Sequence, residues 1–443
     1  MSREDPPIRR LIPKSRFLRR MAMLAGGTAL GQLTLVASSP VLTRLYGPEA
    51  FGALGVFVSL SSILGMVAAL RYEFAIPLAR DERGAVGLVG VANATSVAVT
   101  LATALGVWLA GDWLARITSV PELMPLLWLL PLTVLCNGLC AALGSWSIRR
   151  GTFRMNSANK IVQAAGQAGG QLGLGLAGAG SPGLVVGYCL GPLISLLYFA
   201  RVLPAAERRA LLSVPARRLW PLARAHWQYP VYSAPASLLI TVTQLLPTVL
   251  LAALYGPAVA GWFGLGQRVM GLPSQLLART ASQVFLGEAP RLGNDAAVRR
   301  LFLRSTAGFA ALGLAGMGPV LVLGPWLFAH VFGSAWREAG TMAALLVPQH
   351  LSRFVVIPVS QTLNIYGRQD LHLTASAANG AGLALAFGLA YAVRMDVMTV
   401  VGLYSAATTL AYLLYLGFSW RVVRRGGLPP PAPPEAEAAP LAG

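Results

Sequence analysis

Two arginines lie inside long apolar stretches, where a charged side chain is costly. Arg268 and Arg353 have no acidic residue one helical turn away. A cation at the centre of a membrane helix costs at least about 2.5–3.5 kcal/mol, and such residues commonly serve function. Because a planar guanidinium group can bond two phosphate oxygens at once, the two positions predict a cationic cavity for an anionic, phosphate-bearing ligand.

Amide side chains recur at helical spacing in the same apolar stretches. One stripe runs along 156–171, and a Ser/Thr stripe with Gln244 runs along 233–248. Steps of three, four or seven residues place each set on one helix face, which should avoid lipid. Such a face can line a hydrated cavity or form interhelical hydrogen bonds, and Lys160 and Arg279 could also extend to the membrane surface. The candidate substrate-binding residues are Arg268, Arg353, Lys160, Arg279, Gln163, Gln167, Gln244, Gln275, Gln349 and Asn364.

Signs of catalysis or metal binding are missing from the sequence. None of the four histidines has a partner at metal-ligand spacing, and His350, one turn from Arg353, is expected to be an ordinary polar residue. Cys136 and Cys140 lie on one helix face without a nearby histidine or acid, so they are expected to pack as small apolar residues. No phosphate-binding loop, zincin or nucleophile-elbow motif occurs. We therefore expect no enzyme activity, no metal and no cofactor.

The composition is that of a membrane protein. Hydrophobic residues make up 55% of the 443 residues and charged residues 12%, about half of the roughly 25% that is usual in soluble domains. The net charge of +19 would suggest nucleic acid in a soluble protein. Here the basic residues lie in short loops between apolar runs, which indicates membrane topology instead, so nucleic acid is not an expected partner.

The apolar windows predict an all-α membrane protein of about twelve transmembrane helices. A span needs about 20 apolar residues. The window 161–200 is too long for one helix and should break at the turn signal Gly180–Gly183, and the window from 225 should break at Tyr255–Pro257. The expected spans are 21–43, 50–70, 84–111, 123–148, two within 161–200, two within 225–286, 305–329, 339–366, 371–393 and 397–420.

Loop charges predict that both termini are cytoplasmic. With twelve spans, nearly all basic residues fall on one side, including seven in the first 20 residues. Basic loops stay in the cytoplasm. The first apolar run, at 23 residues, is longer than a signal-peptide core, so no cleavable signal peptide is expected. The other side holds only Arg44, Arg116, Arg337 and Arg394.

A short internal repeat predicts two six-helix lobes. Leu45–Pro48 and Leu254–Pro257 both have the sequence Leu-Tyr-Gly-Pro, 209 residues apart, and each is followed by two glycines at matching positions. Each copy joins the first two helices of its half, so the halves run in the same direction. The expected organisation is a basic tail (1–20), an N-terminal lobe (21–203), a basic linker (204–227), a C-terminal lobe (228–421) and a disordered tail (422–443).

Two motifs resemble those of a known family. The run Ser39–Gly52, with sequence SPVLTRLYGPEAFG, and the run Leu70–Leu78, with sequence LRYEFAIPL, are similar to motifs of the Wzx-type polysaccharide biosynthesis flippases. This resemblance implies membership of the multidrug/oligosaccharidyl-lipid/polysaccharide exporter superfamily. It implies two lobes around a central cavity that opens alternately to each side of the bacterial inner membrane.

The resemblance also implies a substrate and partners. The substrate would be an undecaprenyl-pyrophosphate-linked oligosaccharide, flipped to the periplasmic leaflet for lipopolysaccharide O-antigen, capsule or exopolysaccharide assembly. Membrane lipid, a polysaccharide polymerase and chain-length machinery would be partners. Ion coupling through a cavity acid is in doubt, since no Asp or Glu falls mid-span. The alternatives are a peptidoglycan lipid precursor flippase or a multidrug exporter of the same superfamily, and a membrane glycosyltransferase or polymerase, which would need a longer outward loop.

Overall fold

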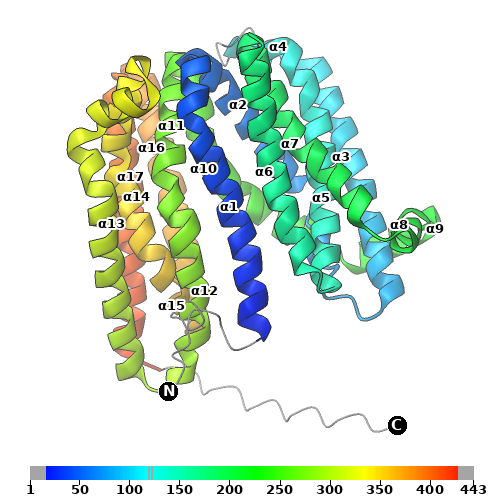
Figure 1. The fold of residues 1–443 in the computed structure, drawn as a ribbon. Coiled ribbons are helices and arrows are strands. Elements are labelled where there is room, and N and C mark those ends of the chain that lie inside the picture. Colours follow the sequence, from blue (N-terminus) through cyan, green and yellow to red (C-terminus); the bar gives the residue numbers. More distant parts are fainter. Residues whose placement is uncertain (1–15, 118–119, 121–122, 428–443) are drawn as a thin grey trace, which may run out of the picture. The chain divides into compact units, whose positions relative to one another are not determined.

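The structure is a computed structural model that describes residues 16–117, 120 and 123–427. In this part of the chain the regular structure consists of helices and no strand is present (Figure 1). This confirms the all-α membrane fold. Most of the expected basic N-terminal tail and all but the first residues of the expected C-terminal tail lie outside the described residues.

Contacts between residues divide the chain into two compact units. Unit 1 comprises residues 1–265 and 329–336, and unit 2 comprises 266–328 and 337–443. The division passes through two helices, α11 (Pro257–Pro273) and α13 (Asp295–Phe332). It differs from the lobe boundary expected at 204–227 by including α10 (Ala234–Tyr255) in unit 1. The arrangement into two six-helix lobes stays a prediction.

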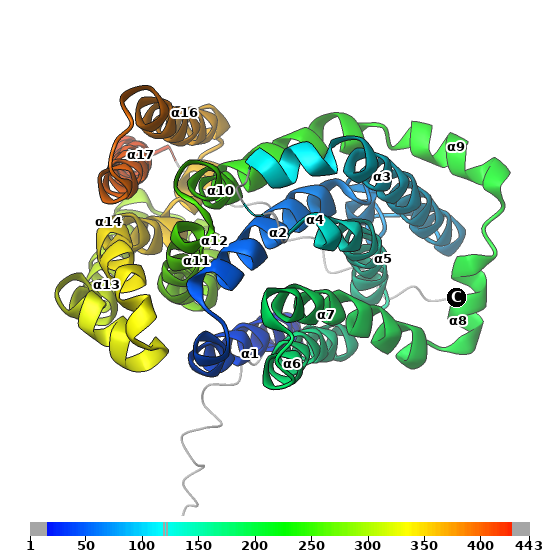
Figure 2. The same cartoon turned by 90° about the horizontal axis from the view of Figure 1, so that it is seen from above.

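Unit 1 contains the first ten helices and the start of the eleventh. The long helices alternate with short connections, while α8 and α9 form the segment between α7 and α10 (Figures 1 and 2). The helices are α1 (Arg16–Leu45), α2 (Pro48–Val67), α3 (Glu82–Ile117), α4 (Leu123–Leu126), α5 (Leu130–Arg149), α6 (Phe153–Leu176), α7 (Gly180–Val202), α8 (Ala205–Leu212), α9 (Ala216–Ala225), α10 (Ala234–Tyr255) and α11 (Pro257–Pro273).

Unit 2 contains the remaining helices and most of α13. The helices are α12 (Arg279–Glu288), α13 (Asp295–Phe332), α14 (Arg337–Val359), α15 (Gln361–Ile365), α16 (Gln369–Val393) and α17 (Val397–Arg425), with a π-helical turn, η5 (Ser274–Ala278), between α11 and α12.

Every expected span is helical, but the count of twelve stays a prediction. Within the described residues, nine helices are long and apolar enough to cross a membrane. The three expected spans that fall outside this group correspond to α1, α6 and the interrupted pair α11–α12. Polar residues cause the difference in α6, which contains an asparagine, lysine and glutamine stripe, and the π-helical turn interrupts the third.

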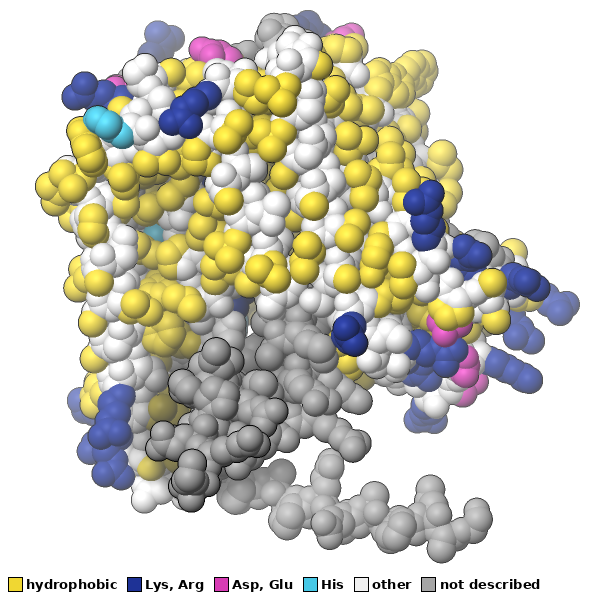
Figure 3. Space-filling model, in the orientation of Figure 1, with side chains coloured by type: hydrophobic (Ala, Val, Ile, Leu, Met, Phe, Trp, Pro, Cys, Tyr) yellow, Lys and Arg dark blue, Asp and Glu magenta, His cyan; other side chains and the backbone are white. Residues whose placement is uncertain are grey.

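Large apolar side chains on the outside are consistent with a lipid environment. Trp108, Val322 and Tyr391 are 70%, 78% and 78% exposed. Hydrophobic side chains cover broad areas of the face shown in Figure 3. Contiguous apolar surface of this kind marks contact with a membrane or another protein, and the length of the helices favours the membrane.

The repeated Leu-Tyr-Gly-Pro motif forms a helix boundary in both copies. Pro48 begins α2 and Pro257 begins α11, and proline is favoured at a first helical position because it lacks only an N–H that would be unpaired there. Gly256 has a φ of 90°, a conformation that favours glycine. The predicted break at Tyr255–Pro257 is therefore confirmed at the residue level.

The second motif, Leu70–Leu78, forms a compact turn in the core of unit 1. Tyr72 and Ile76 are buried against Leu88 of α3 and Trp146 of α5. The Arg149 guanidinium group donates hydrogen bonds to the carbonyl oxygens of Ile76, Pro77, Ala79 and Asp81 at 2.7–3.4 Å. The carbonyls of Ile76 and Asp81 also accept backbone hydrogen bonds from Ala79 and Ala85, so Arg149 adds a second donor there and supplies a donor to Pro77 and Ala79.

Candidate functional site

The predicted cationic residues of unit 2 lie around a break in a helix. Pro273 ends α11, and the π-helical turn η5 follows before α12 begins at Arg279. Proline removes a backbone donor and its ring clashes with the preceding turn, which explains the break. Arg268 and Gln275, on either side of Pro273, are half-buried, whereas Arg279 is exposed.

Helix α14 carries three polar side chains of interest within about one turn, Gln349, His350 and Arg353. Gln349 and His350 are 4% and 2% exposed, and Arg353 is half-buried. Gln349 Oε1, His350 Nδ1 and Arg353 Nε are buried without a hydrogen-bond partner in the described part of the chain. Buried polar atoms are almost always paired, so this turn has unused capacity to bind water or a ligand.

Positive charge gathers beside this turn. The Arg353 guanidinium group interacts electrostatically with Arg279 and with His350. No Asp or Glu occurs between residues 266 and 286 or between 341 and 365. The polar interior of unit 2 therefore favours an anion. Arg279 and Arg353 are therefore close enough to interact electrostatically, and their role in binding a ligand stays a prediction.

A hydrogen-bonded network that sequence reasoning missed supports α14. His350 Nε2 lies 2.8 Å from Gln267 Oε1 of α11, and Tyr404 of α17 hydrogen-bonds with both Gln267 and Thr408. Gln267 is the residue before the predicted Arg268. Its polar amide in an apolar stretch is the one sequence feature that could have identified it as a site residue. The sequence does not reveal that His350 and Tyr404, which lie 83 and 137 positions further along the chain, contact Gln267. The network fixes α11, α14 and α17 around Arg353.

In unit 1, the stripe on α6 is partly used for packing. Gln167 and Gln171 are 8% and 1% exposed, and Gln171 donates a hydrogen bond to the carbonyl of Leu184 on α7 at 3.1 Å. Asn159, which the stripe did not include, exchanges hydrogen bonds with Ser195 at 2.8 and 3.0 Å. For Gln171 the interhelical hydrogen-bond alternative fits the structure.

The other predicted residues are more accessible. Lys160, Gln244 and Asn364 are exposed, and Gln163 is half-buried. Asn364 donates a hydrogen bond to Gln361 at 2.9 Å, within its own short helix. Lys160, Gln163 and Gln244 belong to unit 1, and Asn364 belongs to unit 2. Their role in binding substrate stays a prediction.

Comparison with known sequences assigns the family. Residues 41–341 match the family described as polysaccharide biosynthesis protein. The chain is 24% identical over 331 residues to the succinoglycan biosynthesis transport protein ExoT of Rhizobium meliloti (strain 1021). The match covers 72% of this chain and 63% of that relative, so the chain spans less than two thirds of the relative's length.

Comparison with solved structures shows the fold. An inward-facing multidrug resistance MATE family transporter of the MOP superfamily superimposes with a TM-score of 0.68 at 16% identity, covering 92% of this chain and 98% of that one. The lipid II flippase MurJ, in an inward closed conformation, gives a TM-score of 0.71 at 12% identity, covering 90% and 87%. The chain therefore belongs to the polysaccharide biosynthesis protein family and has the fold of MOP-superfamily transporters.

Proposed function

We propose that the protein flips undecaprenyl-pyrophosphate-linked oligosaccharides from the cytoplasmic to the periplasmic leaflet of a bacterial inner membrane. The exported units would serve surface polysaccharide assembly, as O-antigen, capsule or exopolysaccharide. Membership of the family and similarity to a succinoglycan biosynthesis transport protein support a transporter role. The substrate, its direction of movement and the cytoplasmic location of both termini belong to the proposal.

The observation that carries the proposal is the unpaired polar turn of α14. Arg353 has a buried Nε without a partner in the described residues, and the positive charge of Arg279 is close by. Arginine is suited to a pyrophosphate because its fork pairs with two oxygens of one phosphate. The amide of Gln349, which also has an unpaired oxygen, is suited to a sugar hydroxyl group.

The mechanism follows from this division of roles. The lipid tail stays in the bilayer while the pyrophosphate and sugars pass through the protein by alternating access. The arginines neutralise the phosphates, and the accessible amides Gln163, Gln244, Gln275 and Asn364 bond sugar hydroxyl groups. Moving a negative headgroup outward also runs down an inside-negative membrane potential, which contributes roughly 2.3 kcal/mol per charge per 100 mV.

Charge removal at the site tests the proposal in cells that lack the native gene. Arg268→Ala and Arg353→Ala should abolish export, so that lipid-linked oligosaccharide accumulates and surface polysaccharide is lost although the protein is inserted normally. Arg353→Lys keeps the charge but not the fork and should restore part of the export. The control is Arg300→Ala, at an exposed position of α13, which should export like the wild type. Full export by both alanine variants at the site would refute the proposal.

The same strain separates the alternatives. Unchanged surface polysaccharide together with sensitivity to cationic drugs would identify a multidrug exporter. Accumulation of peptidoglycan lipid precursor would identify a flippase for that substrate. A polymerase and a chain-length protein are proposed partners downstream of export, because the periplasmic product must be joined into longer chains.

A further inference from the structure

The segment 204–227, here called the basic strap, presents a row of arginines without acidic partners. Arg209, Arg217, Arg218 and Arg224 are exposed, and within the described residues their side chains form no hydrogen bond or ion pair. The strap runs along the outside of α3 and α5 (Figure 2), and Figure 3 shows basic side chains projecting in the region of α8 and α9. A segment that only connects α7 to α10 would not need several arginines without partners.

The inner face of the strap is attached to the helices beneath it. Leu219 and Leu222 pack against the core of unit 1. They fit because α3 has glycines at the contact: a Cβ on Gly87 would lie 2.4 Å from Leu222, and a Cβ on Gly90 would lie 3.1 Å from Leu219. The position of α9 on α3 is therefore fixed by close packing.

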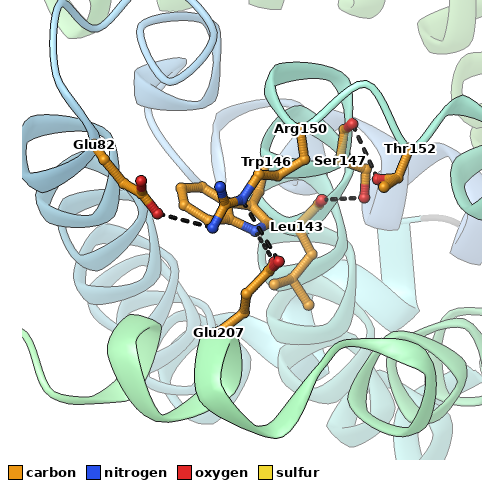
Figure 4. A network of polar contacts seen from close by, with 7 residues as sticks. All are labelled: Glu82, Leu143, Trp146, Ser147, Arg150, Thr152 and Glu207. Atoms are coloured by element: carbon orange, nitrogen blue, oxygen red, sulfur yellow. Dashed lines mark hydrogen bonds and ion pairs between the residues drawn. The ribbon is translucent and has the colours of Figure 1, made fainter.

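Polar contacts hold the first helix of the strap as well. Glu207 of α8 accepts a hydrogen bond of 2.8 Å from Trp146 Nε1 and pairs with Arg150 Nε at 3.5 Å (Figure 4). Arg150 lies over the Trp146 ring at 4.9 Å and also bonds Glu82 at 2.8 Å. The only acid in the strap is used by this anchor, which leaves the outer face wholly basic.

The outer face of α9 combines charge with an exposed aromatic ring. Trp220 is 75% exposed, with Arg217 three residues before it and Arg224 four residues after it. These spacings place all three side chains on one face of the helix. An indole group facing water alone would be unfavourable, but tryptophan is enriched where a protein meets the headgroups of a bilayer.

The packing places α9 at that depth. Gly87 and Gly90 lie about 7.5 and 12 Å along α3 from Glu82, at a rise of 1.5 Å per residue. Charged residues at 80–83 mark the end of α3 that lies in water. The strap therefore lies beside the level at which α3 enters the hydrocarbon, so its outer face is next to lipid headgroups.

We propose that the outer face of α9 is a binding site for the headgroups of anionic phospholipids. Arg217, Arg218 and Arg224 bind phosphate oxygens, and Trp220 inserts beside them at the interface. A lipid fits better than an acidic protein, because the strap lies at the membrane level and an exposed tryptophan accompanies the charge. Lipid binding at the strap would make the protein sensitive to the composition of its own membrane.

Lipid retention by the purified full-length protein tests this site. Native mass spectrometry would compare phosphatidylglycerol with phosphatidylethanolamine for the wild type and for R217Q/R218Q/R224Q. The matched control is R299Q/R300Q/R304Q, which removes three exposed arginines from the start of α13. The wild type and the control should retain phosphatidylglycerol preferentially, and the strap variant should lose that preference at least fivefold with an unchanged melting temperature.

Two further variants sharpen the test. R217K/R218K/R224K keeps the charge and should retain most of the preference, while Trp220→Ser should reduce retention of phosphatidylglycerol without removing its salt dependence. Equal retention of phosphatidylglycerol by the strap variant and the wild type would overturn the proposal, including the case in which the strap binds an acidic protein instead. The assay measures binding without export, so its outcome does not depend on the proposed substrate.

Discussion

Gly52 lies against the backbone of Pro257: a Cβ atom on Gly52 would be 1.8 Å from the Pro257 carbonyl oxygen. The contact is reciprocal, since a Cβ on Gly261 would be 2.0 Å from the carbonyl oxygen of Pro48. Pro48 and Pro257 are the prolines of the two repeated motifs, and Gly52 and Gly261 follow them by four residues. The repeat therefore has a physical role in unit 1, where each copy supplies the glycine that accommodates the other.

Gly52→Ala should destabilise the protein strongly. Overpacking of this kind costs typically about 1–3 kcal/mol, and the clash here is with backbone, which cannot rotate away. The yield of folded protein and the melting temperature should fall, and Gly261→Ala should have a similar effect.

Gly264→Ala is the matched control, because Gly264 belongs to the same repeat and nothing lies within 4 Å of an added Cβ. This variant should be neutral or slightly stabilising, since alanine costs less entropy than glycine in a helix. A Gly52→Ala variant as stable as the control would contradict the close contact.

Arg149→Met should loosen the turn that contains the second family motif. The variant leaves four backbone carbonyls without the Arg149 donors, and a hydrogen bond to a charged group contributes about 1.5–3 kcal/mol. Arg149→Lys should be intermediate, because a single ammonium group cannot reach all four. Thermal unfolding in detergent measures the loss. Arg154→Met, at an exposed position, should change the melting temperature little.

Glu73 should make the stability of unit 1 depend on pH. Burial raises the pKa of its carboxyl group, although Arg71 lies 3.3 Å away. The folded protein therefore binds more protons than the unfolded chain above the usual pKa of about 4.3. The free energy of unfolding should fall as the pH rises from about 4.3 through the pKa of Glu73 in the folded protein. Above that folded pKa the contribution of Glu73 to stability is completely lost. Glu73→Gln should flatten this part of a melting-temperature profile, whereas the same change at the exposed Glu49 should leave its slope intact.

The sequence predicted local features better than contacts. The break at Tyr255–Pro257 was found because glycine and proline determine the backbone there. The break near Gly180 was placed slightly late: α7 already begins at Gly180, because Ser181 and Pro182 fit a first helical turn.

Contacts between distant elements could not be predicted in the same way. The pair Asn159–Ser195 and the pair Gln267–His350 join residues on separate helices. Their side chains meet only because of how the helices rotate and pack, which hydropathy does not encode. For the same reason, Gln171 could be recognised as polar and inward-facing, but not as a residue that bonds the backbone of α7.

Glu207→Ala should release the basic strap. The substitution removes the acceptor of Trp146 and a partner of Arg150, which together contribute about 1–2 kcal/mol, so the strap should open roughly 5- to 30-fold more often. Trypsin should then cleave at the strap arginines correspondingly faster. Glu82→Ala removes a more exposed partner of Arg150 and should change cleavage little. Equal cleavage rates in the two variants would show that packing of α9 alone holds the strap.

His350 and Gln267 should be energetically coupled. His350→Leu leaves the Gln267 oxygen without its 2.8 Å partner, which should cost about 1–3 kcal/mol. Gln267→Leu should cost a similar amount, and the double variant should be more stable than the sum of the two by about 1 kcal/mol. The free energies come from unfolding in detergent. As a control, His350→Leu should be additive with Ser376→Ala, because in the described part of the chain the Ser376 hydroxyl group bonds within α16, to His372. Additivity of His350 and Gln267 would mean that the network does not hold α14 in place, and that Arg353 is positioned by apolar packing instead.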